Sequence, residues 1–178
     1  MNKTVIIMGS SRSNGNTYKA CKIVCDKLQG IDFINLADYE INDFCYENKF
    51  ANDDFHKLII NIIKNYHTII LATPIYWYTM SAPMKRFLDR TTDLLKYYKD
   101  LGRLLRGKNL AVITSYGEHP QGKDGFEPIF KNTANYLGMN YLGCYFHFSG
   151  DDISATEDNN KNLRDFCSNL ENNNCLVN

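Results

Sequence analysis

The chain has 178 residues, of which 44% are hydrophobic and 22% charged, and its 20 basic and 20 acidic residues give a formal net charge of zero. Zero net charge argues against a whole-protein attraction for nucleic acid or anionic membranes, and no apolar run approaches membrane-spanning length. The length and composition are typical of one globular domain. We therefore expect a single domain over residues 1–178, with neither nucleic-acid nor membrane partners.

The cysteines and the N-terminal region predict the cellular location. The first residues enter a strand pattern directly, without the pattern of a secretory signal. The six cysteines show neither a Cys-x-x-Cys pair nor a zinc-binding spacing: Cys21, Cys25, Cys45, Cys144, Cys167 and Cys175. We therefore expect reduced thiols, no metal site and a cytoplasmic protein.

Apolar runs alternate with stretches of helical period along the chain. Short runs rich in β-branched residues are typical of strands buried on both faces of a parallel sheet, and they predict strands at 4–8, 31–36, 67–73, 109–115 and 140–149. Apolar residues spaced three or four apart predict helices at 16–28, 53–66, 81–91, 125–138 and 156–172. Residues 37–52 follow neither period and predict an irregular segment.

This order of elements predicts an α/β fold, with a doubly wound sheet between helical layers. Ligands of such sheets bind at the carboxyl ends of the strands, beside a topological switch point. The loops that follow the first, third and fourth predicted strands are therefore the candidates for a binding site.

The first loop, "GSSRSNGNT" (9–17), runs from a buried strand into a helix. The amino end of a helix favours an anion, and this loop adds hydroxyl, amide and guanidinium donors from Ser10, Ser11, Arg12, Ser13, Asn16 and Thr17. Neither G-x-x-x-x-G-K-[ST] nor G-x-G-x-x-G is present, so the loop predicts a grip on a phosphate monoester that does not react. The alternative is a Ser/Asn-rich turn that only caps the helix.

The second and third loops carry aromatic residues. The second begins with "PIYWY" (74–78), and three adjacent aromatic residues in a loop suit the wall of a pocket for a flat ring. The third, "SYGEHPQG" (115–122), adds another aromatic residue and two glycines. Glu118 and His119 in this loop could touch a substrate, and solvated loop side chains are the alternative.

At these two motifs, "GSSRSNGNT" and "TPIYWYTMSAPMKRFLDR" (73–90), the sequence resembles the NAD(P)H-dependent FMN reductase family of flavodoxin-like proteins, which includes relatives of the iron–sulfur flavoproteins. The resemblance spans residues 1–150 or so. It implies a flavodoxin-like three-layer sandwich whose five-stranded parallel sheet has the order 2-1-3-4-5. It also implies an enzyme that assembles as a homodimer or homotetramer.

The resemblance further implies FMN as cofactor and NADPH or NADH as electron donor. Hydride would pass to the flavin N5 and then to a small acceptor such as a quinone, a flavin or a nitroaromatic, in a ping-pong mechanism without a catalytic side chain. The first-loop residues would hold the phosphate, the second loop would flank the isoalloxazine and the third would hold its polar edge. The residues of the last two loops are Pro74, Ile75, Tyr76, Trp77, Ser115, Tyr116 and Gly117.

One departure from the family, one basic stretch and two alternative functions bear on this interpretation. Iron–sulfur relatives carry a four-cysteine cluster before the second helix, where this chain has only Cys45, so we expect no iron–sulfur centre. The basic stretch 99–108, including Arg103, is either a contact for the extra phosphate of NADPH or a solvated connection. The first alternative function is a flavodoxin-type electron carrier, although such carriers are usually acidic. The second is a protein that kept the fold and lost the cofactor.

Overall fold

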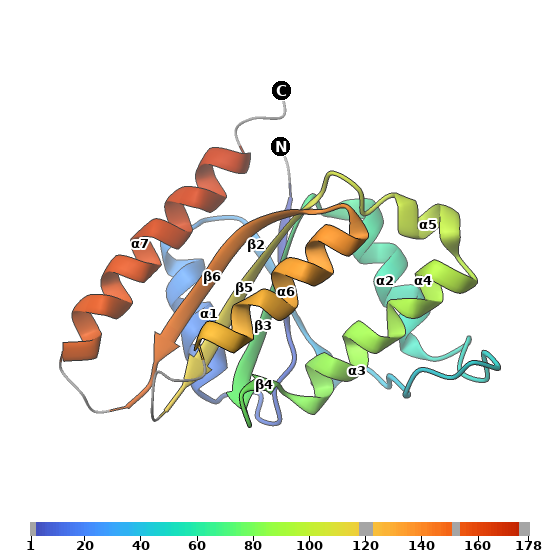
Figure 1. Cartoon of the computed structure of the whole chain (residues 1–178), viewed down its shortest axis with the longest axis horizontal. Helices are drawn as coiled ribbons and strands as arrows, with labels where there is room; N and C mark the ends of the chain where they lie inside the picture. The colour runs from blue at the N-terminus through green and yellow to red at the C-terminus, as the bar shows by residue number, and fades with distance from the viewer. Residues whose placement is uncertain (1–2, 118–122, 151–153, 175–178) are drawn as a thin grey trace.

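The computed structural model describes residues 3–117, 123–150 and 154–174, and it places a central β-sheet between two layers of helices (Figure 1). Five long strands run parallel in the order β2-β1-β3-β5-β6. They are β1 (Thr4–Met8), β2 (Ile31–Asn35), β3 (Thr68–Tyr76), β5 (Asn109–Tyr116) and β6 (Asn140–Phe148). The predicted α/β class and the predicted order of the long strands are therefore confirmed.

A sixth, two-residue strand was not predicted and accounts for the different strand numbers. β4 (Thr79–Met80) pairs antiparallel with the end of β3, where Tyr76 lies opposite Thr79. β3 therefore ends three residues later than predicted, and the chain turns back after it at the carboxyl edge of the sheet. This hairpin lies at the lower end of the molecule in Figure 1.

Helices cover both faces of the sheet. α1 (Asn16–Lys27) and α7 (Ser154–Asn174) pack on one face, and α2 (Asp54–Asn65), α3 (Ala82–Arg90) and α6 (Lys123–Leu137) on the other (Figure 1). Two short helices that were not predicted, α4 (Thr92–Lys96) and α5 (Lys99–Arg103), continue the path of α3. After a 3₁₀ turn, η1 (Leu36–Asp38), residues 39–53 form no regular element, as the sequence predicts.

The core explains why the strands read as continuous apolar runs. Along β1, Val5 and Ile7 point into the cluster beneath α2 and α3, whereas Ile6 and Met8 point into the cluster beneath α1 and α7. All four side chains are buried, because both faces of a parallel sheet are covered. β1 is flanked by β2 on one side and β3 on the other, so the winding direction changes between β1 and β3. The loops after these two strands therefore meet at the switch point.

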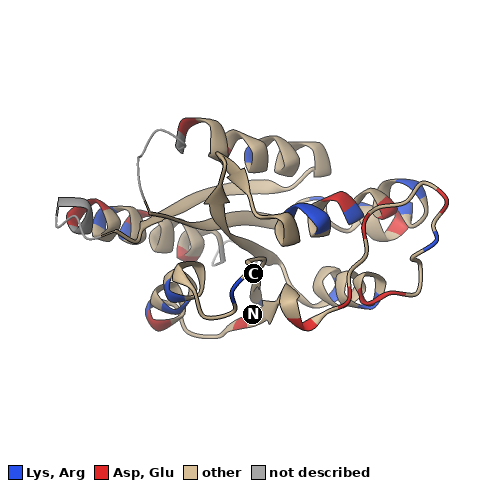
Figure 2. Cartoon of the chain, turned by 90° about the horizontal axis from the view of Figure 1, so that it is seen from below, with Lys and Arg blue, Asp and Glu red and all other residues tan. Residues whose placement is uncertain are grey.

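Charged residues of both signs are interspersed along the helices seen in Figure 2. Among residues 3–117, 123–150 and 154–174, no helix is both long and apolar enough to cross a membrane.

Candidate functional site

A pocket opens at the carboxyl edge of the sheet, where the three predicted loops meet. Its lining consists of Ser10, Arg12, Gly15, Asn16, Thr17, Pro74, Ile75, Tyr76, Ser115, Tyr116, Gly117 and Ser149. Every residue predicted for the site is in this lining except Ser11, Ser13 and Trp77. Gly15 and Ser149 are additions that the sequence analysis did not select.

The first loop forms one wall of the pocket and presents groups that favour an anion. α1 begins after Gly15, whose backbone is extended and which has no side chain to cap the helix, and the first turn has no acidic residue. The amino end of α1 therefore presents backbone N–H groups and the positive end of the helix dipole. Arg12 folds back along the loop, since a Cβ built on Gly15 would lie 3.5 Å from its Nε. Arg12 is exposed and takes part in none of the ion pairs within the described part of the chain.

Of the three serines in the first loop, only Ser10 lines the pocket. Ser11 and Ser13 are exposed, and the Ser13 hydroxyl accepts a hydrogen bond of 3.0 Å from the Asn35 side chain at the end of β2. Ser10 is buried, and its hydroxyl accepts from the Arg12 backbone N–H at 3.4 Å. The loop thus divides its hydroxyl groups between the pocket and the neighbouring strand.

Two buried hydroxyl groups form the floor of the pocket. Thr17 Oγ1 and Ser115 Oγ lie 2.8 Å apart, which ties the first turn of α1 to the end of β5. A hydroxyl group can donate one hydrogen bond and accept two, so each retains bonding capacity for a ligand. The structure thus brings Thr17 and Ser115 together from two distant parts of the sequence.

Ser81 joins the first two loops. Its hydroxyl donates a hydrogen bond of 2.7 Å to the Gly9 carbonyl and accepts from Thr73 at 3.1 Å, and it also caps α3 by accepting from the Met84 N–H at 3.4 Å. Ser81 is thus the N-cap that the sequence predicts. A Cβ on Gly9 would lie 2.8 Å from the Met84 backbone nitrogen, so only glycine permits α3 to approach the loop this closely.

The third predicted loop forms another wall of the pocket, which we call the third wall, and residues at the end of β6 and just after it hold it in place. The backbone N–H and the hydroxyl of Ser149 both donate to the Tyr116 carbonyl, each at 2.9 Å, and the rings of Tyr116 and Phe148 are 5.4 Å apart. A Cβ on Gly150 would lie 2.4 Å from the Phe148 ring and 2.9 Å from the Gly117 carbonyl. The sequence signal for this contact is "FSG" (148–150), whose first two residues end the fifth predicted strand. Glu118 and His119 lie outside the described residues.

The aromatic loop contributes one ring to the lining. Tyr76 lines the pocket, whereas Trp77 and Tyr78 occupy the tip of the β3–β4 hairpin and are 93% and 67% exposed. The expectation that Trp77 lies in the pocket wall is thus not what the structure shows. The chain turns back after Tyr76, and this reversal carries the next two rings outward.

The basic stretch 99–108 lies at the opposite edge of the sheet. It leads into Asn109 at the start of β5, whereas Ser115 and Tyr116 at the other end of that strand line the pocket. In Figure 1, α5 and the β4 hairpin lie at opposite ends of the molecule. Arg103 also pairs with Asp100 at 2.5 Å. The interpretation of this stretch as a contact for the extra phosphate of NADPH is therefore wrong for a nicotinamide bound at the pocket.

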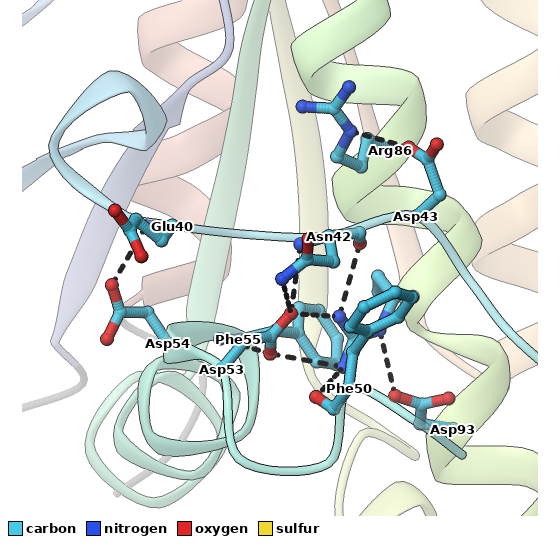
Figure 3. A network of polar contacts seen from close by, with 10 residues as sticks. Glu40, Asn42, Asp43, Phe50, Asp53, Asp54, Phe55, Arg86 and Asp93 are labelled. Atoms are coloured by element: carbon cyan, nitrogen blue, oxygen red, sulfur yellow. Dashed lines mark hydrogen bonds and ion pairs between the residues drawn. The ribbon is translucent and has the colours of Figure 1, made fainter.

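A buried ionic cluster lies at the far end of α3, around the Asp53 and Asp93 carboxylates labelled in Figure 3. Arg90, whose side chain is 2% exposed, binds both carboxylate oxygens of Asp53, the Asp93 carboxylate at 3.0 Å, and the carbonyls of Asn42 and Phe50 at 3.2 Å each. All five guanidinium N–H groups are thereby used. Burial opposes ionisation of Asp53, but its hydrogen bonds with Arg90 and the Asn42 N–H outweigh burial and lower its pKa. Arg90 therefore has no donor left for a ligand, and its bonds to Asn42, Phe50 and Asp53 anchor the 39–53 segment.

Comparisons with known proteins agree with this geometry. The family model described as NADPH-dependent FMN reductase matches residues 2–152. YwqN of Bacillus subtilis, whose name describes an NAD(P)H-dependent FMN-containing oxidoreductase, is 32% identical over 154 residues, which are 79% of this chain and 82% of YwqN.

Two solved structures share the fold. The Trp repressor binding protein from Bacillus subtilis superposes with a TM-score of 0.69 at 23% identity, covering 93% of this chain and 97% of its own. An FMN-dependent NADH-azoreductase from Bacillus anthracis, in complex with FMN, superposes with a TM-score of 0.64 at 16% identity and covers 100% of both chains.

Proposed function

Because the chain belongs to the NADPH-dependent FMN reductase family, we propose that it passes two electrons from NAD(P)H through FMN to a small-molecule acceptor in a ping-pong reaction. It is a flavin oxidoreductase with FMN as cofactor and NAD(P)H as electron donor. The proposal adds the residues that hold the cofactor, the order of the two half-reactions and the kind of acceptor.

The observation that carries the site assignment is the unpaired positive charge beside an uncapped helix. The Arg12 guanidinium and the amino end of α1 face the same pocket, and neither has an acidic partner in the described structure. A phosphate dianion matches both, because it accepts several charge-assisted hydrogen bonds at once. The hydroxyl groups of Ser10 and Thr17 and the amide of Asn16 complete the phosphate site.

The remaining walls suit a flat, polar-edged ring. Tyr76 and Tyr116 line the pocket from two different loops, and Pro74 and Ile75 give it an apolar side. Ser115 and Gly117 supply hydroxyl and backbone groups for the polar edge. FMN supplies the hydride chemistry when it is bound, and the protein supplies binding and orientation. We assign no side chain as acid or base.

The net reaction fixes the balance of electrons and protons. NAD(P)H, one proton and an acceptor such as a quinone give NAD(P)⁺ and the acceptor reduced by two electrons and two protons. The loops that line the proposed pocket all lie at the carboxyl edge of the sheet, so the nicotinamide and the acceptor would approach the flavin from the same side and in turn. This sequence of events is the basis of the ping-pong order.

The charge distribution bears on the main alternative, a flavodoxin-type carrier. Such carriers are found by their protein partners through an acidic surface, since a field of one sign steers association. Here the net charge is zero and both signs are interspersed along the helices (Figure 2). This distribution favours a small-molecule acceptor over a protein partner.

We further propose a cytoplasmic protein that assembles as a homodimer or homotetramer and lacks an iron–sulfur centre. The five described cysteines form no disulfide, which fits a reducing compartment. Cys45 instead donates its thiol hydrogen to Glu47 at 2.8 Å. Light scattering tests the assembly, and a monomer at assay concentration would contradict it.

The experiment that tests the function is anaerobic reduction followed by reoxidation. Purified protein reconstituted with FMN is mixed with NADPH or NADH, and the flavin absorbance is followed before a quinone is added. Rapid bleaching, and recovery on quinone addition, is the expected result. Bleaching without recovery would reject quinones as acceptors. A flavin that NAD(P)H leaves oxidised would support the alternative of a flavodoxin-type electron carrier.

A further inference from the structure

The tip of the β3–β4 hairpin has an unfavourable backbone. Only Trp77 and Tyr78 separate the paired residues Tyr76 and Thr79, and their φ angles are +49° and +65°. Positive φ at both central residues is the type I′ turn, which strongly prefers Asn-Gly. In bulky residues this conformation costs free energy at each position, and such strain persists where the surroundings or a function require it.

Burial does not offset this cost. Trp77 is the most exposed large hydrophobic side chain described, at 93%, and Tyr78 beside it is 67% exposed. Two large rings therefore stand in solvent on a strained turn that asparagine and glycine would form without strain. Rings this exposed contribute little burial to the fold, and a contact outside the chain would account for them.

The tip is firmly held beside the pocket. Its base is fixed by β-pairing and by Met80 and Ser81, which are almost fully buried. The Ser81 N–H also donates to Thr73 Oγ1 at 3.0 Å. Tyr76 at the start of the turn lines the pocket, so the two exposed rings lie immediately beyond its edge.

The chemistry of the hairpin selects an uncharged contact. Residues 74–80, "PIYWYTM", contain no charged side chain. Aromatic faces bind other planar rings by stacking, and the hairpin itself has no charged side chain that could form an ion pair with a charged acceptor. On the basis of the proposed function, we propose that Trp77 and Tyr78 form a stacking surface that selects uncharged, planar aromatic electron acceptors, of which quinones are the simplest class.

Tryptophan fluorescence tests this contact directly, because Trp77 is the only tryptophan in the chain. FMN-loaded protein is titrated with 2-methyl-1,4-naphthoquinone, and acrylamide serves as a collisional quencher. Saturable quenching by the quinone, beyond the linear quenching that acrylamide gives, is the expected result. Linear quenching by both compounds would overturn the proposal.

Two tyrosine variants provide a matched pair for the titration. Tyr78→Ala removes a ring from the tip, whereas Tyr136→Ala removes a ring of similar exposure, 77%, from α6. We expect Tyr78→Ala to weaken quinone binding at least about threefold, as loss of one aromatic contact does, and Tyr136→Ala to leave it unchanged. Equal effects of the two substitutions would contradict a specific contact at the tip.

A third variant separates the rings from the turn. Trp77→Asn combined with Tyr78→Gly installs the favoured turn, so we expect the Tm to rise by a few degrees. Reoxidation of the reduced protein by the naphthoquinone should slow at least about tenfold. Reoxidation by ferricyanide, a charged and non-planar acceptor of which two equivalents are consumed, should not change. Equal slowing with both acceptors, or no slowing with the quinone, would overturn the selectivity.

The same variant distinguishes the remaining outcomes. A protein that binds no FMN, or is not reduced by NAD(P)H, would refute the proposed function rather than the stacking surface. A change in oligomeric state of the Asn-Gly variant, measured by light scattering, would assign the tip to a contact between copies of the chain and would overturn the acceptor assignment.

Discussion

The two ends of α3 place polar groups in opposite ways. At its amino end, Ser81 joins two loops through neutral hydrogen bonds, and the nearby Arg12 stands exposed without an ion-pair partner in the described structure. At its carboxyl end, Arg90 is buried and fully hydrogen-bonded (Figure 3).

This difference indicates two roles: the amino end of α3 is suited to ligand binding, and the carboxyl end anchors a chain segment. A buried and fully paired charge holds segments together but has nothing to offer a ligand, whereas an exposed and unpaired charge costs little until a ligand arrives. Perturbed pKa values alone would have placed a site at Asp53 and Arg90. The hydrogen-bond count instead leaves Arg90 without a free donor for a ligand, so the proposed site lies at the other end of the helix.

The largest effect is expected from breaking the anchoring end. Arg90→Met leaves the Asp53 and Asp93 carboxylates buried without their partner, which should lower the free energy of unfolding by about 3–5 kcal/mol. Urea denaturation measures the loss. Lys85→Met, which removes an exposed ion pair with Asp89, is the matched control and should cost about 0–1 kcal/mol. Equal costs would contradict the anchoring role.

A smaller effect is expected where α3 meets the first loop. Gly9→Ala would place a methyl group 2.8 Å from the Met84 backbone and push the loop and the helix apart, at about 1–3 kcal/mol. FMN affinity should fall as well, because this contact positions both walls. Gly125→Ala is the control, since its Cβ would meet no atom within 4 Å and alanine favours a helix. Unchanged FMN affinity in Gly9→Ala would refute the idea that the contact between Gly9 and Met84 positions the FMN site.

A still smaller effect is expected at the third wall. Ser149→Ala removes the hydroxyl bond to the Tyr116 carbonyl and leaves the backbone bond in place, so FMN binding should weaken by about 1 kcal/mol. Ser168→Ala on the exposed face of α7 should have no effect. Fluorescence titration with FMN compares the two, and identical affinities would remove Ser149 from the site.

The smallest effect is a pH dependence near the pocket. His147 lies beside Ser115 in the sheet, and burial, followed by the nearby Lys19, lowers its pKa. The unfolded chain therefore binds more protons, and stability should decline as pH falls through the unfolded value of about 6.5 toward the lower folded pKa. His147→Gln should flatten that decline. A wild-type slope that persists in the variant would assign it to another group, such as His67, whose pKa is also lowered.

The sequence patterns predicted those features that depend on neighbouring residues alone, such as buried strands and helix caps. Buried strands such as 4–8 need apolar runs, and the Ser81 cap needs only the helix that follows it. The features that the sequence did not predict rest on long-range contacts: Arg90 meets Asp53 from 37 positions away, and Ser149 holds Tyr116 from 33. The hairpin was missed for another reason, because Trp77-Tyr78 is the opposite of the residue pair that such a turn prefers.

The central claim is that Arg12 and the amino end of α1 hold the phosphate of FMN, and comparing FMN with riboflavin tests it most directly. The two ligands share the isoalloxazine and differ in the phosphate, so the ratio of their Kd values isolates its contribution. We expect the wild type to prefer FMN strongly, and Arg12→Ala to lose about 10- to 100-fold of that preference while its riboflavin affinity stays the same. An unchanged ratio in Arg12→Ala would contradict the account.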